Sequence, residues 1–232
     1  MKNTINVQDL YKTNPSIFDG ATKGLIDALE TNAVKQNVTS LRNRRLITLA
    51  GQAELFDTTV NKIEGITDFD KGMLSGNQAF LVTGLQLRYA RSAASGGTTT
   101  PQSQRFSNTI YALDLFAVNG ATVDVDSGAT GNQNVAVPVQ VIPTELLNAD
   151  FNFQINSNVK FKAPASDFFI ENQRLEKASG HEDYVIDLEH APILLLPNKP
   201  LQSVLRFNPS VTNPSNFNHF VEITFRGSYI YE

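Results

Sequence analysis

Histidine is the side chain best suited to acid–base chemistry and metal binding near neutral pH, and this chain of 232 residues has three, His181, His190 and His219. The stretch 181–190 is the densest group of potential metal ligands, with four carboxylates between two histidines. His181 lies in a polar stretch and His190 precedes Ala191-Pro192, so we interpret both as loop residues. His219 lies in an alternating strand, where we expect a partly buried histidine with a hydrogen-bond partner.

Other motifs that carry chemistry are weak or absent. Residues 124–128, DVDSG, contain part of an acidic calcium loop, but the remaining ligands of an EF-hand do not follow, so we expect an exposed turn. The sequence has no G-x-S-x-G elbow, no P-loop and no glycine-rich dinucleotide fingerprint. We therefore predict that the protein is not an enzyme, with no catalytic residue, no cofactor and no metal.

Positive charge gathers in one place, at Arg42, Arg44 and Arg45. Residues 1–45 carry seven Lys or Arg against four Asp or Glu, whereas residues 46–232 carry twelve against nineteen. The acidic body predicts no strong direct binding of nucleic acid. The arginine cluster is either a solvated junction between two elements or a contact to phosphates or to an acidic neighbour.

The elements that must position these residues begin with an N-terminal region, residues 1–45. Residues 1–13 predict an extended arm, and Asn14-Pro15 predicts the start of a helix. Apolar residues then recur at three- and four-residue spacing as far as Asn37, which predicts one amphipathic helix. Such a helix can pack on its own sandwich, on a neighbouring subunit or on a membrane surface. Its apolar residues Phe18, Leu25 and Leu29 are candidate assembly contacts, as are the three arginines.

Residues 46–232 predict one all-β domain of about eleven strands. Residues 109–118 are apolar on both faces, which predicts a buried central strand, and residues 151–161 contain a hairpin signature around Asn156 to Asn158. The last strand, 217–231, alternates apolar and polar residues almost to the C-terminus. We expect an antiparallel jelly-roll β-sandwich, with one roll favoured and a compact double roll as the alternative.

Within the last strand, Gly227 interrupts the apolar positions, which predicts a bulge or a close backbone approach. A bend there would let Tyr229 and Tyr231 reach a second sheet or a neighbouring subunit, so both are candidate assembly contacts. The chain has no cysteine, which excludes disulfides. We expect neither a secretory signal nor a transmembrane helix.

Three passages carry a family resemblance: QAFLVTGLQLRYA (78–90), LLNADFNFQINSNVKFKAP (146–164) and the segment from ILLLPNKP to the C-terminus (193–232). With the arm and the helix, they resemble the jelly-roll major capsid proteins of tailless icosahedral bacteriophages, some of which enclose a membrane. The resemblance spans most of the chain and concerns layout and composition. It implies a self-assembling shell subunit that forms homo-oligomers, with trimers as building blocks, and that contacts other virion proteins and an inner membrane. It also implies a location in the virion after synthesis in the host cytoplasm.

Two other classes of protein fit the same architecture. A lectin-like or adhesin module would bind its ligand through the loops 92–107 and 128–134, which are small, polar and glycine-rich. A cupin-like metalloenzyme would hold a stoichiometric metal, but the His-x-His pair and following Glu of that family are not in the sequence. Electron microscopy, glycan binding and metal content distinguish the three.

Overall fold

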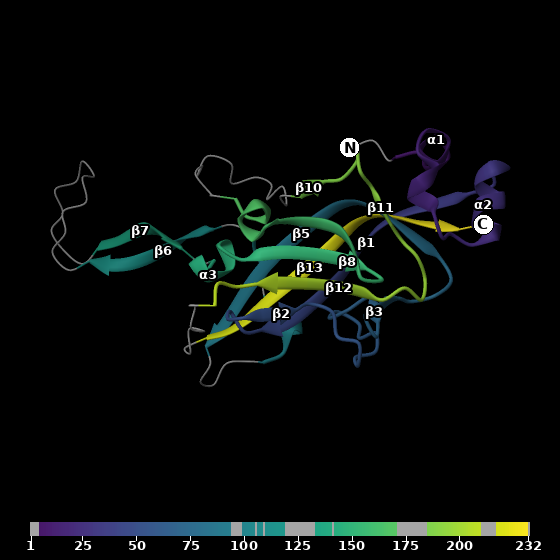
Figure 1. The fold of residues 1–232 in the computed structure, drawn as a ribbon. Coiled ribbons are helices and arrows are strands. Elements are labelled where there is room, and N and C mark those ends of the chain that lie inside the picture. The colour runs from purple at the N-terminus through teal and green to yellow at the C-terminus, as the bar shows by residue number, and fades with distance from the viewer. Residues whose placement is uncertain are drawn as a thin grey trace, which may run out of the picture.

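Antiparallel β-strands are the main secondary structure, and the N-terminal helices gather at one end of the molecule (Figure 1). The computed structural model describes residues 5–93, 99–104, 106–108, 110–118, 133–140, 142–170, 185–209 and 217–231. None of the helices in these ranges combines the length and the hydropathy that a membrane-spanning helix requires.

The larger sheet is built around the C-terminal strand β13 (Phe217–Tyr231). β13 pairs along its length with β1 (Lys35–Ile47) on one side and with β5 (Ala79–Ala93) on the other. The short strands β10 (Ile186–Asp187) and β11 (Ile193–Leu195) pair with the far side of β5. All of these pairings are antiparallel, and the prediction of a long final strand held in a sheet is confirmed.

The second sheet has the order β2 (Gln52–Glu54), β12 (Leu201–Arg206), β8 (Asp150–Ile155), β9 (Asn158–Pro164). A two-residue turn joins β8 to β9, and Asn156 and Ser157 in that turn both have positive φ, 50° and 65°. Positive φ at both central residues is the geometry of a type I′ hairpin turn. The predicted hairpin is therefore confirmed.

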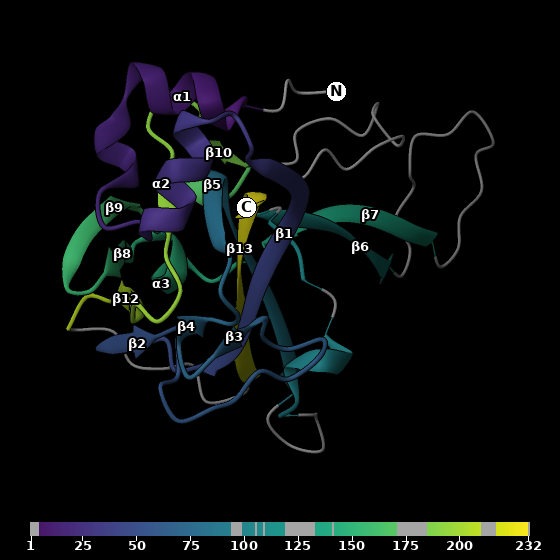
Figure 2. The same ribbon diagram turned by 90° about the vertical axis from the view of Figure 1, so that its right-hand side faces the viewer.

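The two sheets enclose one hydrophobic core, as in a β-sandwich (Figures 1 and 2). Phenylalanine rings join them: Phe153 of β8 lies 5.1 Å from Phe225 of β13, between ring centroids. Phe56 and Phe69 contact Phe225 as well, at 6.1 and 5.7 Å. Phe69 belongs to a small ladder of β3 (Phe69–Asp70) and β4 (Met73–Leu74).

The strand predicted at residues 109–118 is not central. β6 (Tyr111–Val118) pairs with β7 (Gln133–Gln140), and in the described residues this hairpin joins no other strand. Both views show it leaving the body of the molecule (Figures 1 and 2). The prediction was wrong because apolar residues on both faces of a strand indicate burial but do not identify the partner that provides it.

The N-terminal region also differs from the prediction of an arm and one helix. It forms α1 (Val7–Thr13), the 3-10 helix η1 (Pro15–Phe18) and α2 (Lys23–Glu30). Gly20, with φ of 83°, breaks the predicted helix, and the Thr22 hydroxyl then caps α2 by accepting from the Leu25 amide at 3.3 Å. β1 already begins at Lys35, so the predicted domain boundary at residue 45 falls within this strand.

These helices lie on the sheet of their own chain, beside the C-terminal end of β13 (Figures 1 and 2). Their apolar side chains form a second, smaller core with residues of β5, β11 and β13, and the buried members are Val7, Phe18, Leu25, Leu29, Ala79, Leu81, Leu194 and Ile230. Of the three surfaces considered for the apolar side of the predicted helix, the structure shows packing on the chain's own sandwich. Three short elements complete the chain: η2 (Pro101–Ser103), α3 (Thr144–Leu147) and η3 (Ala165–Phe168).

Gly227 marks an irregularity in the central strand, as predicted. The register between β13 and β5 shifts between Arg226 and Gly227. A Cβ at Gly227 would collide with the backbone carbonyl of Leu81 on β5. The missing side chain therefore permits a close backbone approach, and the bulge prediction is confirmed.

Candidate functional site

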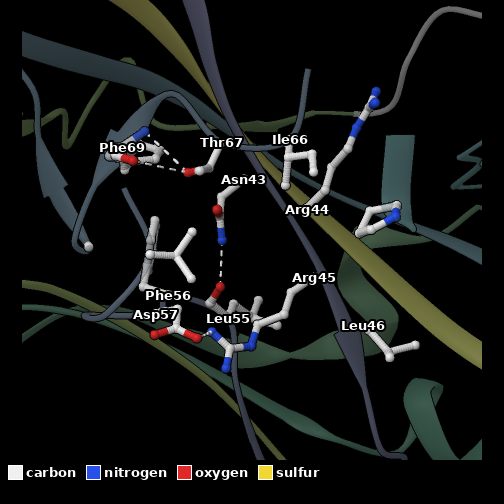
Figure 3. A pocket seen from close by; sticks show the side chains of 13 residues that line it. Asn43, Arg44, Arg45, Leu46, Leu55, Phe56, Asp57, Ile66, Thr67 and Phe69 are labelled. Carbon is white, nitrogen blue, oxygen red and sulfur yellow. Dashed lines mark hydrogen bonds and ion pairs between the residues drawn. The ribbon is translucent and has the colours of Figure 1, made fainter. Parts of the chain in front are cut away.

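The three arginines of β1 do not form one basic patch, because successive side chains of a strand point to opposite faces. Arg44 lies on the outer face of the larger sheet and Arg45 on the opposite side, and Figure 3 shows the two extending in different directions. The exposed Arg42 shares the outer face with Arg44. The predicted cluster is thus divided between two environments.

On the outer face, Arg44 belongs to a row of charges that crosses three strands. The sheet register places Arg44 of β1 and Arg88 of β5 on either side of Glu222 in β13. Arg44 Nε lies 2.5 Å from Glu222 Oε2, and Arg88 Nη1 lies 3.4 Å from Glu222 Oε1. Glu222 is only 2% exposed. Two guanidinium groups thus flank one buried carboxylate and compensate its charge.

Further polar contacts tie this row together. The Thr224 hydroxyl donates to Glu222 Oε1 at 3.4 Å, and the Gln86 amide oxygen accepts from Arg88 Nη2 at 2.9 Å. Arg44 Nη1 also donates to the Gly65 carbonyl at 3.0 Å, and its guanidinium lies 4.9 Å from the centre of the Phe106 ring. The Arg44 guanidinium therefore already has several partners within its own chain. We infer that this row of charges helps to hold the three long strands β1, β13 and β5 together.

On the other side of β1, Arg45 lines a pocket of about 300 Å³ between this strand and residues 55–72 (Figure 3). Arg45 Nη1 lies 3.0 Å from Asp57 Oδ2, and both side chains are about one-third exposed. Hydrogen bonds from the hydroxyl and the amide of Thr59, with the Arg45 charge, lower the pKa of Asp57 below its ordinary value. The Asp57 carboxylate is therefore an anion at neutral pH and a poor proton donor.

The inner part of this pocket is apolar, with Leu55, Phe56 and Phe69 among its lining residues. Asn43 Nδ2 donates to the Leu55 carbonyl at 2.5 Å, so the side-chain NH₂ of Asn43 already has a hydrogen-bond acceptor within the chain. Of the described residues that line the pocket, Asp57 is the only carboxylate. The pocket therefore has no pair of carboxylates to divide acid and base roles. What it offers is a small apolar recess beside one exposed ion pair.

His219 is buried and pairs with Tyr89 across the sheet, as expected for a histidine with a hydrogen-bond partner. The Tyr89 hydroxyl lies 2.6 Å from His219 Nδ1, and the two rings are stacked with centroids 6.0 Å apart. Burial raises the pKa of the Tyr89 hydroxyl well above its ordinary value, so the hydroxyl remains protonated at neutral pH. His190 is exposed in a loop, as predicted, and His181 lies outside the described residues.

The described ranges contain no group of three or more His, Cys, Asp or Glu side chains placed to hold a metal ion. The predicted turn at 124–128 lies outside these ranges, as do residues 94–98, 105 and 128–132 of the loops 92–107 and 128–134 for which ligand binding was considered. The metal and glycan hypotheses therefore stay predictions.

The apolar candidate contacts are used within the chain. Phe18, Leu25 and Leu29 are buried in the core between the helices and the larger sheet. The half-buried Tyr229 packs its ring edge-on against Phe80, with centroids 5.1 Å apart, and burial raises the pKa of its hydroxyl. Tyr231 is partly exposed at the end of β13, beside a small recess shared with α2.

Sequence reasoning missed Glu222, the residue that organises the outer face. A signal was present, because Glu222 is the one carboxylate within the alternating residues 217–231. Its significance depends on the register, which brings Arg44 and Arg88 beside it from distant parts of the chain. Comparison with known proteins gives no match to any family model, curated protein or solved structure.

Proposed function

We propose that the protein is a structural subunit of a viral coat, which self-assembles into an icosahedral shell and has a single jelly roll as its body. The observation that carries this proposal is the hairpin β6–β7, which projects from the body (Figures 1 and 2). Of the sixteen residues in its two strands only Asp114 is charged. A two-stranded hairpin of this composition is marginally stable alone and gains stability from a partner, which a neighbouring subunit supplies.

The order of strand pairing supports the jelly roll. The first strand pairs with the last, β1 with β13, and the second with the last but one, β2 with β12. Farther inward, β5 pairs with β10 and β11, and β8 pairs with β9. Such nested pairing is what a long hairpin produces when it is rolled into two sheets, as in jelly rolls, which occur in viral capsid proteins, lectins and cupins.

The placement of the apolar N-terminal residues limits which surfaces take part in assembly. Because Phe18, Leu25 and Leu29 are buried within the chain, we propose that contacts between subunits use the hairpin, the loops and the sheet edges. A shell built in this way would contain trimers as building blocks and would place the subunit in the virion.

The test is electron microscopy and analytical ultracentrifugation of the concentrated protein, compared with a variant that lacks the hairpin. Residues 111–141 can be replaced by Asn-Gly, because the Ile142 amide already lies 3.4 Å from the Ile110 carbonyl. We expect discrete assemblies from the full chain, and a folded but far less associated variant. A full chain that stays strictly monomeric at high concentration would refute the proposal. Saturable binding on a glycan array by such a monomer would instead identify the lectin-like module.

A further inference from the structure

The outer edge of β1 is only half covered. Near its C-terminal end, Arg44 N donates to the Ile66 carbonyl at 2.9 Å, and Asp68 N donates to the Arg42 carbonyl at 3.0 Å. Even-numbered residues of β1 therefore direct their backbone groups away from β13. By the alternation of an antiparallel ladder, Gln36, Val38 and Ser40 do the same. Within the described residues no hydrogen bond reaches the outward backbone groups of these three.

The same stretch is exposed on both faces as well as along its edge. The side chains from Asn37 to Ser40 are exposed, and Val38 is the most exposed large apolar residue described, at 63%. Residues 36–41, QNVTSL, carry no charge. The Gln36 amide holds the start of the strand against the segment before α1, since its Nε2 donates to the Ile5 carbonyl at 3.0 Å. The edge is thus presented in a fixed position.

The other edges of the two main sheets are protected in ways that this one is not. Monomeric proteins block exposed edges with charged residues, proline or very short strands. β9 carries Lys160, Lys162 and Pro164, and β2, β10 and β11 have two or three residues each. An unprotected edge of this length is a template for pairing with another strand.

We propose that residues 36–40 of β1 pair antiparallel with the same segment of a second copy of this chain, about a two-fold axis at Val38. Gln36 then faces Ser40 of the second copy, and the two Val38 side chains face each other. An uncharged segment can pair with an identical copy in this register, because the pairing places no like charges opposite each other. The inference rests on the proposed function and specifies one of the contacts through which the subunit assembles.

The chain contains no cysteine, so one introduced cysteine reports on the contact without interference. Hydrogen-bonded residues directly opposite in an antiparallel pair have Cα atoms about 5.5 Å apart, within the range that a disulfide spans. We therefore expect V38C to form a disulfide-linked dimer on mild oxidation. The matched control is V159C, because Val159 is also exposed, at 57%, and also lies on an edge strand. Pre-association should make V38C link at least about tenfold faster. Equal rates would overturn the proposal.

A second pair of variants tests the contact at equilibrium. V38K places two positive charges opposite each other and should weaken association about fivefold or more, whereas V159K should not. Sedimentation velocity measures both effects, and thermal unfolding verifies that the variants are folded. If the chain associates but V38K has no effect, the edge contact is wrong and the coat proposal stands. If the chain does not associate at any concentration, both fail. If V38K loses a different protein that co-purifies with the unaltered chain, and its self-association is unchanged, then that protein pairs with the β1 edge and the proposed second copy does not.

Discussion

At the scale of single residues, two neighbouring arginines are expected to differ sharply in their contribution to stability. Arg44 compensates the buried Glu222 carboxylate, whereas Arg45 pairs with Asp57 at the surface. Without Arg44, the buried Glu222 carboxylate keeps only the longer contact to Arg88, whereas an exposed pair such as Arg45–Asp57 contributes little. We expect Arg44→Ala to lower the free energy of unfolding by about 3 kcal/mol. Arg45→Ala should lower it by less than about 1 kcal/mol. Urea denaturation of both variants checks this, and equal losses would contradict the assigned roles.

The buried Tyr89 hydroxyl makes stability depend on alkaline pH. Its pKa is raised from an ordinary value of 10.0, so the folded chain holds this proton more tightly than the unfolded chain. The stabilisation is therefore complete below pH 10 and is lost as the pH rises above it. Tyr89→Phe removes the titrating group and the bond to His219. We expect the variant to be less stable at pH 8 and to lose stability less steeply between pH 9 and 11. Parallel slopes in urea titrations would contradict this.

At the scale of elements, the turn between β8 and β9 offers a stabilising change. Ser157 has a φ of 65°, a backbone conformation that is unfavourable for any residue with a Cβ atom. Asn-Gly is the preferred residue pair for this turn. Ser157→Gly should therefore raise the free energy of unfolding by about 1 kcal/mol. Ser157→Val should lower it, because a β-branched residue fits this conformation poorly. Thermal unfolding of the two variants measures both signs, and a destabilised Ser157→Gly would contradict the turn assignment.

Elements specified by local patterns were predicted well, and elements that depend on distant contacts were not. Strict alternation predicted β13, and Asn156 to Asn158 predicted the β8–β9 hairpin, since side-chain alternation and turn chemistry are local. The helical stripe was misread because three- and four-residue spacing also fits successive short helices, and Gly20 interrupts it. The charge row around Glu222 could not be predicted, because it needs the register of three strands that are far apart in sequence.

At the scale of the whole molecule, a well-covered body carries two uncovered pieces. The body buries a cluster of phenylalanines, Phe153 and Phe225 among them, between the two sheets and packs its N-terminal helices against one of them. Within the described residues, the hairpin β6–β7 pairs with no other strand, and the outer edge of β1 is exposed from Asn37 to Ser40. A subunit gains from this division, because the rigid body fixes where each uncovered piece meets a neighbour. Stability and association are then thermodynamically linked, since binding to other copies favours the folded state.

This linkage predicts that the melting temperature rises with protein concentration. Above the dissociation constant, a tenfold increase in partner concentration adds about 1.4 kcal/mol to the folded state. For a chain of this size, that corresponds to about 3 to 6 °C. Differential scanning calorimetry over two decades of concentration measures the slope, and the variant lacking residues 111–141 serves as the control. We expect the slope to be nearly lost in that variant while its melting temperature at the lowest concentration stays close to that of the full chain. A concentration-independent melting temperature in the full chain would show that folding and assembly are not coupled in it.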